Sequence, residues 1–283
     1  MTRTRSRRTA ALLLLLPCLL VLGALFLAPQ ALVLEASLGR RSAYGGVVHA
    51  WSLQNYGRAL QPLYLGILAR SVGLAAVTTG ACLLVGLPVA WWLAQRAPAR
   101  FRNGLLVLMI LPFWTSFLVR TYAWVFLLRS EGLVNVCLAG LGLPTLSLLY
   151  NDFAVLLGQV YGELPFMILP LFASLEKLDR SLLEAAADLG APPARSFWRV
   201  TLPLVRPGIV AGCVLVFVPS LGAYLAPDLL GGARTVYAGS LIQSQFAVAR
   251  DMPFGAALSF VLSLIVLALL FAFRRPLQAA QDA

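Results

Sequence analysis

Hydrophobic residues occur in this chain in long unbroken runs, with polar residues confined to the stretches between them. A run of about 20 apolar residues is what an α-helix needs to cross about 30 Å of hydrocarbon. Six stretches reach that length, and we expect each to be a membrane-spanning helix: 11–34, 64–94, 104–128, 153–175, 208–227 and 255–273. The pattern therefore predicts an all-α integral membrane protein whose 283 residues form a single transmembrane domain.

The first run follows four arginines, as the core of a secretory signal peptide does. Its length, from Ala11 to Leu34, exceeds the roughly 7–15 residues of such a core, and Pro29 spoils the small-residue cleavage candidate. We therefore expect an uncleaved first span. An export signal built on Arg7 and Arg8 is the alternative.

Composition agrees with the apolar runs. Hydrophobic residues make up 60% of the chain, charged residues 12%, and the mean hydropathy is +0.85. A soluble domain carries about 25% charged residues. The polar residues here are too few to cover a water-soluble protein of this length, so that class is excluded.

The charge balance indicates an orientation in the membrane. The chain has 22 lysines and arginines against 11 acidic residues, a net charge of +11. In a soluble protein this excess would suggest a nucleic acid partner, but cytoplasmic loops of membrane proteins also collect basic residues. With both termini cytoplasmic, fourteen of the 22 lie inside, seven lie outside and Arg120 lies within a span. We therefore expect a multi-pass membrane protein with both termini cytoplasmic and no nucleic acid partner.

The long cytoplasmic loop 176–206 reads as two short helices. Ser181 and Glu184 form a capping-box pattern at the start of the first helix. Gly190 stands where a left-handed residue ends a helix, Pro193 can open the second helix, and Pro203 is expected to end it. Because a helix of about eight residues is not stable alone in water, the first helix must dock on something.

The same loop carries a motif at fixed spacing: Glu184, Ala185, Ala186, Gly190, Leu202 and Pro203. It resembles the EAA---G---------I-LP loop of ATP-binding-cassette importer permeases, with Val200 in place of the usual isoleucine. The resemblance implies that the short helix is a coupling helix, which inserts into a groove of a cytoplasmic ATPase. Glu184 would engage a basic group there, the two alanines would allow close approach, and Gly190 would turn the chain.

Simpler roles remain open for these residues. Glu184 can serve only to complete the capping box, and Gly190 only to stop the helix. One observation favours a partner: Glu184 and Asp188 are like charges four residues apart, which mildly destabilises a lone helix. A basic partner would relieve this repulsion.

Further stretches narrow the resemblance to spermidine/putrescine-type permeases: 111–124, 161–179, 219–232 and 244–259. It implies a pathway for polyamines or similar small organic cations through the lipid bilayer of the bacterial inner (plasma) membrane. It also implies three kinds of partner subunit: an ATPase present as a dimer, a second permease (a homologue or a second copy), and a periplasmic or extracellular substrate-binding protein.

Residues for other chemistry are lacking in the sequence. No GxxxxGK[ST] motif occurs and Lys177 is the one lysine, so we expect the chain to hold no ATP site of its own and not to be an enzyme. With a single histidine, His49, and four widely spaced cysteines, we expect no catalytic residues, no metal and no cofactor.

Charged residues inside spans are costly and are therefore functional candidates. Glu163 falls near the middle of the fourth span and Arg120 within the third. They either pair with each other as structural glue, or Glu163 faces the substrate pathway and stabilises a passing ammonium group. Asp228 is a second candidate acid, and Tyr224 and Trp114 could offer aromatic faces to a cation or serve only in packing.

Breaks in the fifth span point to the same pathway. Pro219, Gly222 and Pro227 interrupt its regular backbone, and irregular backbone at membrane depth is tolerated only where it is buried or lines a cavity. The rival hypothesis is a self-contained secondary carrier that uses Glu163 as a relay. A membrane enzyme would need a catalytic constellation that the sequence does not contain.

Overall fold

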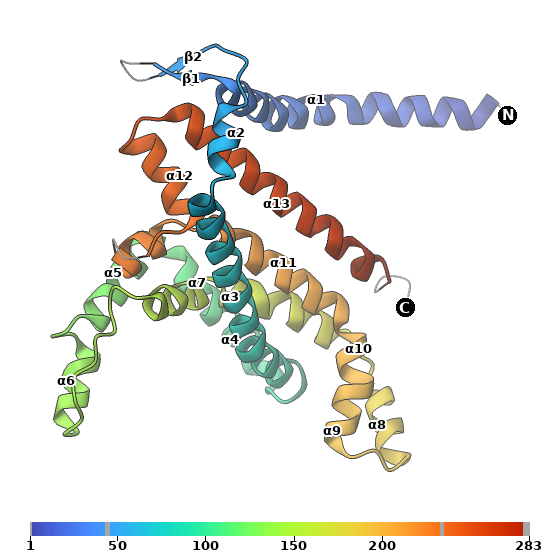
Figure 1. Cartoon of the computed structure of the whole chain (residues 1–283). Helices are drawn as coiled ribbons and strands as arrows, with labels where there is room; N and C mark the ends of the chain where they lie inside the picture. The colour runs from blue at the N-terminus through green and yellow to red at the C-terminus, as the bar shows by residue number, and fades with distance from the viewer. Residues whose placement is uncertain (1, 43–45, 233–234, 280–283) are drawn as a thin grey trace. The chain divides into compact units, whose positions relative to one another are not determined.

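The computed structural model describes residues 2–42, 46–232 and 235–279, which are almost entirely helical (Figure 1). In chain order the elements are α1 (Thr2–Leu38), β1 (Arg40–Arg41), β2 (Val47–Val48), α2 (Gln54–Ala59), α3 (Pro62–Gln95), α4 (Ala99–Ile110), the 3₁₀-helix η1 (Leu111–Trp114), α5 (Phe117–Leu128), α6 (Leu133–Gly140), α7 (Asp152–Glu176), α8 (Arg180–Asp188), α9 (Pro193–Ser196), the π-helix η2 (Phe197–Thr201), α10 (Leu202–Leu204), α11 (Arg206–Gly222), the π-helix η3 (Pro227–Gly231), α12 (Ala238–Ala247) and α13 (Met252–Ala279). The two short strands pair antiparallel. The prediction of an all-α fold is confirmed.

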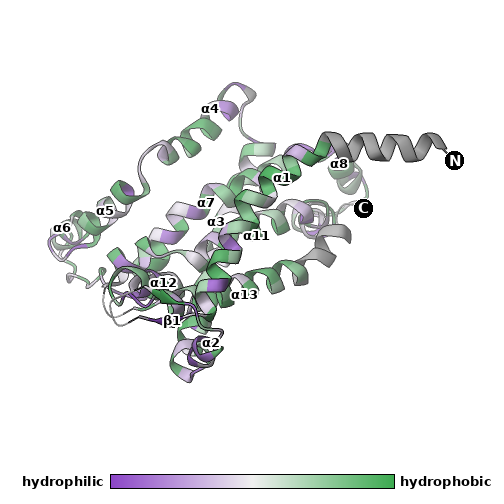
Figure 2. Ribbon diagram, turned by 90° about the horizontal axis from the view of Figure 1, so that it is seen from above, coloured by the Kyte–Doolittle hydropathy of each residue, from purple (hydrophilic) through white to green (hydrophobic). Residues whose placement is uncertain are grey.

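Five helical segments in the described part of the chain are long and apolar enough to cross a membrane. They are Leu15–Leu38, Pro62–Gln95, Phe117–Gly140, Asp152–Glu176 and Met252–Phe271. A sixth is obtained when Pro193–Leu204 and Arg206–Gly222, which meet at a bend of 66°, are taken as one span. Hydrophobic residues cover the long helices on most sides, while polar residues gather around β1 and α2 (Figure 2).

The third apolar run is not the single helix expected over 104–128. The helix α4 ends at Ile110, η1 follows, and Thr115 and Ser116 are extended (ψ 149° and 135°) before α5 begins. Pro112 lies in η1, and proline lacks an amide hydrogen and clashes with the preceding turn of an α-helix. The candidate span therefore starts after the break and runs through α6 instead.

The chain divides into two compact units. One comprises the chain up to Leu65 together with Ile242–Ser263, and the other comprises Gly66–Leu241 together with the residues from Leu264 onward. The second unit contains the long loop and the charged spans. That both units form a single permease domain stays a prediction.

Within the second unit, α3 and α7 run parallel and in register. The hydroxyl of Thr78 donates to Oε1 of Gln159 over 3.0 Å, and Nε2 of Gln95 donates to the carbonyl of Leu175 over 3.4 Å. The two pairs are 81 and 80 positions apart in the sequence, so the offset is nearly constant between the middle of α3 and its end. A nearly constant offset means that α3 and α7 lie alongside each other over about five turns.

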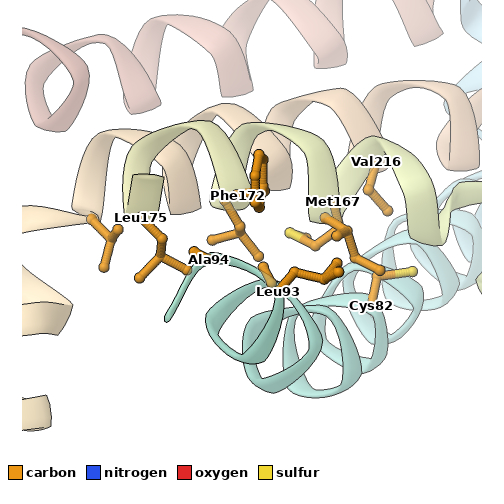
Figure 3. Close-up of a cluster of buried hydrophobic side chains, with 11 residues drawn as sticks. Cys82, Leu93, Ala94, Met167, Phe172, Leu175 and Val216 are labelled. Atoms are coloured by element: carbon orange, nitrogen blue, oxygen red, sulfur yellow. The ribbon is translucent and has the colours of Figure 1, made fainter. Parts of the chain in front are cut away.

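The helix α11 packs antiparallel on α7 through glycines. Gly208 lies against Pro170 and Ser174, and Gly212 lies against Met167, so the residue numbers on α7 fall as those on α11 rise. Close approach brings α3, α7 and α11 around one hydrophobic cluster, shown in Figure 3. The side chains labelled there are Cys82, Leu93, Ala94, Met167, Phe172, Leu175 and Val216.

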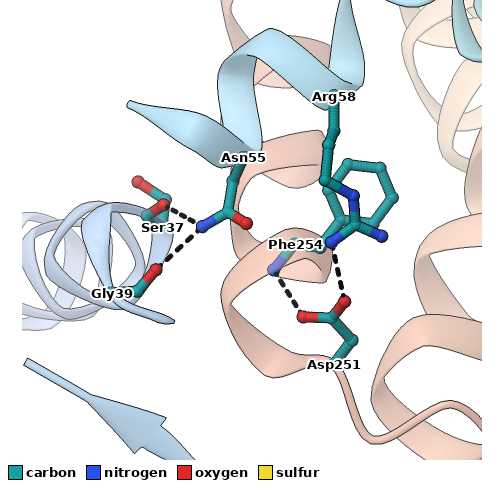
Figure 4. A network of polar contacts seen from close by, with 6 residues as sticks. All are labelled: Ser37, Gly39, Asn55, Arg58, Asp251 and Phe254. Carbon is teal, nitrogen blue, oxygen red and sulfur yellow. Dashed lines mark hydrogen bonds and ion pairs between the residues drawn. The ribbon is translucent and has the colours of Figure 1, made fainter. Parts of the chain in front are cut away.

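Within the first unit, a polar network joins three segments (Figure 4). The amide nitrogen of Asn55 donates to the carbonyls of Ser37 and Gly39, each over 2.9 Å. Nη1 of Arg58 lies 3.0 Å from Oδ2 of Asp251, and its guanidinium carbon lies 4.0 Å above the ring of Phe254. The other carboxylate oxygen of Asp251 accepts the backbone N–H of Phe254 over 3.3 Å and so caps α13. This network ties α2 to the end of α1 and to the start of α13.

Replacing Asp251 with alanine is expected to destabilise the first unit. The carboxylate is 7% exposed, so its loss leaves Arg58 without its counter-charge and removes the cap of α13. The cost is about 2–3 kcal/mol for charge-assisted hydrogen bonds. Thermal unfolding of the purified chain in detergent measures it. Asp251→Asn keeps an acceptor for the Phe254 N–H and should lose less; equal stability of wild type and the alanine variant contradicts this account.

Candidate functional site

The first helix of the long loop, α8, is capped by Asp179 and not by Ser181. The carboxylate of Asp179 accepts the backbone N–H of Ser181 over 3.0 Å, which places Ser181 inside the helix. The predicted capping box is therefore wrong. Glu184 does not reach back to the helix start, and it makes no hydrogen bond or ion pair with any described residue.

The end of α8 has the left-handed geometry predicted at Gly190, whose φ is +75°. The N–H of Gly190 donates to the carbonyl of Ala187 over 2.8 Å, and the N–H of Ala191 donates to that of Ala186 over 2.9 Å. This pair of bonds is a Schellman motif, which satisfies carbonyls that the helix end would otherwise leave free. Both ends of this nine-residue helix are thus closed by local hydrogen bonds.

One face of α8 is presented to solvent. Leu183 and Ala186 are half-buried and packed toward α9 and η2, whereas Glu184, Ala185 and Asp188 are exposed. Leu189 is 89% exposed and Leu182 is 45% exposed, although both are large apolar side chains. A short, doubly capped helix with exposed leucines, and with acids that bond no described residue, has the composition of a docking surface.

The capping bond makes α8 sensitive to acid. Because the Asp179 carboxylate accepts the Ser181 N–H, its pKa is lowered. A lowered pKa means that the cap contributes fully above the ordinary pKa of aspartate and is lost as the pH falls through the lowered value. We expect hydrogen exchange over 179–190, corrected for the intrinsic rate, to speed up in that acidic window. Asp179→Asn retains a cap that does not titrate, so an unchanged acid response in that variant would contradict the assignment.

The second part of the loop forms one continuous arm, 193–204, made of α9, η2 and α10. Pro193 opens it at the first helical position, as predicted. Pro203 lies in its last turn, and the arm ends at Leu204, one residue after the predicted end. Leu202 is half-buried, Pro203 is exposed, and the arm meets α11 at Val205, which is fully buried.

Arg120 and Glu163 do not form the stabilising ion pair that was one of the two alternatives for these residues. Arg120 lies in the first turn of α5 and Glu163 in the middle of α7, and no ion pair within 4.0 Å joins them in the described chain. The guanidinium carbon lies instead 4.8 Å from the ring centroid of Phe113 and 5.7 Å from that of Phe117. We call Phe113 and Phe117 the aromatic pair. The spacing of three residues between Phe117 and Arg120 is the signal in the sequence that indicates this contact.

The other predicted pathway residues lie apart from this pair of charges. Trp114 ends η1 with its side chain 90% exposed. Tyr224 follows the end of α11, where Ala223 leaves the helical conformation, and its carbonyl accepts the N–H of the exposed Asp228 over 2.9 Å. The break predicted in the fifth span is therefore present after Gly222, with Pro227 opening η3. Pro219 stays inside α11.

Two further buried polar side chains were missed by the sequence analysis. Nε2 of Gln159 on α7 and the hydroxyl of Ser220 on α11 are buried and have no hydrogen-bond partner among the described residues. Gln159 precedes Glu163 by one helical turn, so both lie on the same side of α7. Uncharged polar residues inside apolar runs carry a weak signal in sequence, since most of them are satisfied by neighbouring carbonyls.

Comparisons with known proteins agree with this architecture. The family described as binding-protein-dependent transport system inner membrane component matches residues 86–277. The spermidine/putrescine transport system permease protein PotB of Escherichia coli (strain K12) is 41% identical over 249 residues, covering 87% of this chain and 90% of the relative. The inner membrane ABC transporter permease protein YdcU of the same strain is 34% identical over 241 residues, covering 81% and 76%.

Solved structures share the fold. A bacterial alginate ABC transporter, in complex with an alginate pentasaccharide-bound periplasmic protein, has a chain that matches with a TM-score of 0.74 and 18% identity. The match covers 97% of each chain. The MetNI methionine ABC transporter in an inward-facing conformation matches with a TM-score of 0.57 over 78% of this chain and 99% of the other. At this level of identity the likeness concerns the fold alone.

Proposed function

Because this chain belongs to the family of binding-protein-dependent transport system inner membrane components, and is a multi-pass permease subunit of an ATP-binding-cassette importer, we propose that it forms the pathway for a polyamine. The importer interpretation is thereby confirmed over the self-contained carrier. Permeases of this family lack an ATP site of their own, and a separate subunit hydrolyses ATP.

The proposed substrate rests on relatives and on charge. Relatives that share about 40% of their residues over most of both chains carry spermidine/putrescine transport in their names. A polyamine is a flexible chain of ammonium groups, and the acid Glu163 lies within α7 with a buried carboxylate oxygen that no described residue bonds. An unpaired acid in an otherwise apolar span suits a cationic substrate.

The observation that carries the proposed coupling is the exposed, doubly capped α8. We place its outward face, with Glu184, Ala185 and Asp188 between Leu182 and Leu189, against the cytoplasmic ATPase. The acids would meet basic groups and the leucines would fill an apolar groove. Gly190, Leu202 and Pro203 would shape the loop behind this face.

The proposed orientation places both termini in the cytoplasm, in line with the two-to-one excess of basic residues on that side. The other proposed partners are an ATPase dimer, a second permease and a binding protein that delivers the substrate from outside. Alternating access would then arise from relative movement of the spans around a site near the membrane midplane.

Transport by the reconstituted importer tests the proposal. The chain is co-purified with its ATPase and second permease, placed in proteoliposomes loaded with ATP, and supplied externally with the binding protein and radiolabelled spermidine. We expect uptake that requires ATP and that unlabelled putrescine reduces, whereas an uncharged amino acid does not. Uptake without ATP would contradict the importer mechanism, and ATP-driven uptake of another substrate but not of polyamines would contradict the substrate.

A further inference from the structure

Two oppositely charged side chains of the second unit, Arg120 and Glu163, have buried atoms that bond no described residue. Nε and Nη1 of Arg120 and Oε2 of Glu163 are buried, and none of the three has a hydrogen-bond partner in the described chain. Their elements meet at this point, because Phe117, in the same turn of α5 as Arg120, lies against Gly162, the residue before Glu163. Leaving a buried charged group without a partner is costly, so each of the two side chains lacks an interaction that it could make with a counter-charge.

The aromatic pair explains where Arg120 rests. The quadrupole of an aromatic ring attracts a cation over its face, and the guanidinium lies over Phe113 and Phe117. Ring faces accept no full hydrogen bonds, so they hold the charge without satisfying the N–H groups. The contact of Arg120 with the aromatic pair is therefore an alternative to an ion pair with Glu163. It does not supply the hydrogen bonds that such an ion pair would make.

The aromatic pair is itself held by residues that flank Glu163 on α7. The ring of Phe113 meets the ring of Phe166 edge-on at 5.1 Å. Gly162 faces the ring of Phe117, where a β-carbon would lie 3.5 Å from Cε2. The rings that hold Arg120 therefore contact α7 on both sides of Glu163, at Gly162 and at Phe166.

The backbone break of the third apolar run lies between the two rings. Phe113 belongs to η1 and Phe117 is the first residue of α5, with the extended Thr115 and Ser116 between them. The two rings that contact Arg120 therefore come from different elements, one before the break and one after it.

We propose that Glu163 is a binding subsite for an alkylammonium group of the substrate and that Arg120 is its tethered competitor. When Arg120 rests on the aromatic pair, as in this structure, the carboxylate is open to an ammonium group, which brings one positive charge and three donors. When the substrate leaves, Arg120 turns to Glu163 and neutralises it. This inference rests on the proposed function, since it assumes a cationic substrate.

Equilibrium binding of radiolabelled spermidine to the complete importer complex, without the binding protein, tests the competition. Arg120→Gln removes the competing charge and is expected to lower the dissociation constant about tenfold, a free-energy change of about 1.4 kcal/mol. Phe113→Leu weakens the resting place of Arg120, drives it toward Glu163, and is expected to raise the dissociation constant about threefold. In the Arg120→Gln background, Phe113→Leu should not change the dissociation constant for spermidine, because the arginine that the ring would hold is absent.

Each outcome decides the inference. If Arg120→Gln binds spermidine no more tightly than the wild type, the inference is overturned. It is also overturned if Phe113→Leu still lowers the affinity for spermidine in the Arg120→Gln background, because the ring would then contact the substrate directly. Arg120→Met, whose apolar side chain suits the same rings, replaces Arg120→Gln should the latter fail to insert. If the wild type takes up spermidine with ATP but both Arg120 variants bind it with unchanged affinity, this inference alone is contradicted. If the wild type takes up no spermidine, the proposed function is contradicted as well.

Discussion

Replacing Gly190 with valine is expected to lower transport by about tenfold or more, while the protein still inserts into the membrane. Gly190 has a φ of +75°, a conformation that a β-branched residue adopts only at a cost of order 1–3 kcal/mol. No neighbouring atom lies within 4 Å of where a β-carbon would be, so the effect comes from the backbone and not from a clash. A cost of 1.4 kcal/mol corresponds to a tenfold change in an equilibrium. The Schellman bonds then break, and the docking face of α8 loses its fixed orientation.

Gly190→Asn is the matched control, because asparagine tolerates the left-handed region. It should retain most of the transport, measured as ATP-driven spermidine uptake in proteoliposomes. Glu184→Arg tests the face itself: Glu184 is exposed and bonds no described residue, so reversing its charge leaves the fold intact and should weaken co-purification of the ATPase. Normal uptake by both Gly190→Val and Glu184→Arg would exclude α8 as the coupling helix.

Replacing Gly208 with alanine is expected to cause the largest loss of stability among glycine substitutions in the α7–α11 contact. A β-carbon there would meet the Ser174 hydroxyl and would lie 2.7 Å from the backbone carbonyl of Pro170. The carbonyl belongs to α7 and cannot turn away, so α11 must shift. Overpacking of this kind costs about 1–3 kcal/mol. A lower midpoint of thermal unfolding in detergent, with reduced yield of monodisperse protein, is the expected measurement.

Two other glycines provide a graded control. At Gly212 the nearest atom, 2.7 Å away, is the flexible sulfur of Met167, so alanine there should cost less. Gly80 in α3 is exposed and has no atom within 4 Å, so alanine should be neutral or slightly stabilising through its higher helix propensity. Equal effects at Gly208 and Gly80 would contradict the close α7–α11 contact.

The sequence predicted well those features that depend on local composition. Apolar runs located most of the spanning helices, because the helical rise and the thickness of the hydrocarbon together set the length of a span. Gly190 was predicted to be left-handed because a glycine at the end of an apolar face, followed by prolines, has few other uses. The family motif then identified the loop.

The sequence failed where two local solutions competed. Asp179 and Ser181 are both good capping residues, and the choice depends on where the chain leaves α7, at Glu176 and Lys177. The predicted third span, 104–128, runs through Pro112 because the stretch is mostly apolar, but the missing N–H of the proline favours a break there.

The relation between Arg120 and Glu163 could not be predicted from sequence. Both residues were recognised as candidates because charges inside apolar runs are rare. Whether they bond depends on how α5 and α7 are rotated about their axes, and this rotation is set by packing between residues such as Phe113 and Phe166. Long-range packing leaves no periodic trace in a single sequence.

The bend at Val205 allows the loop to act as a lever on α11. The arm 193–204 has twelve helical residues and is therefore about 18 Å long. Its inner end is fixed, because Val205 is completely buried in the core formed by α3, α7 and α11. A push of about 3 Å at the outer end, where α8 is attached, is then equivalent to a turn of about 10° at the pivot. Since the arm and α11 meet at 66°, part of such a push is converted into torque on the span and part into displacement along it.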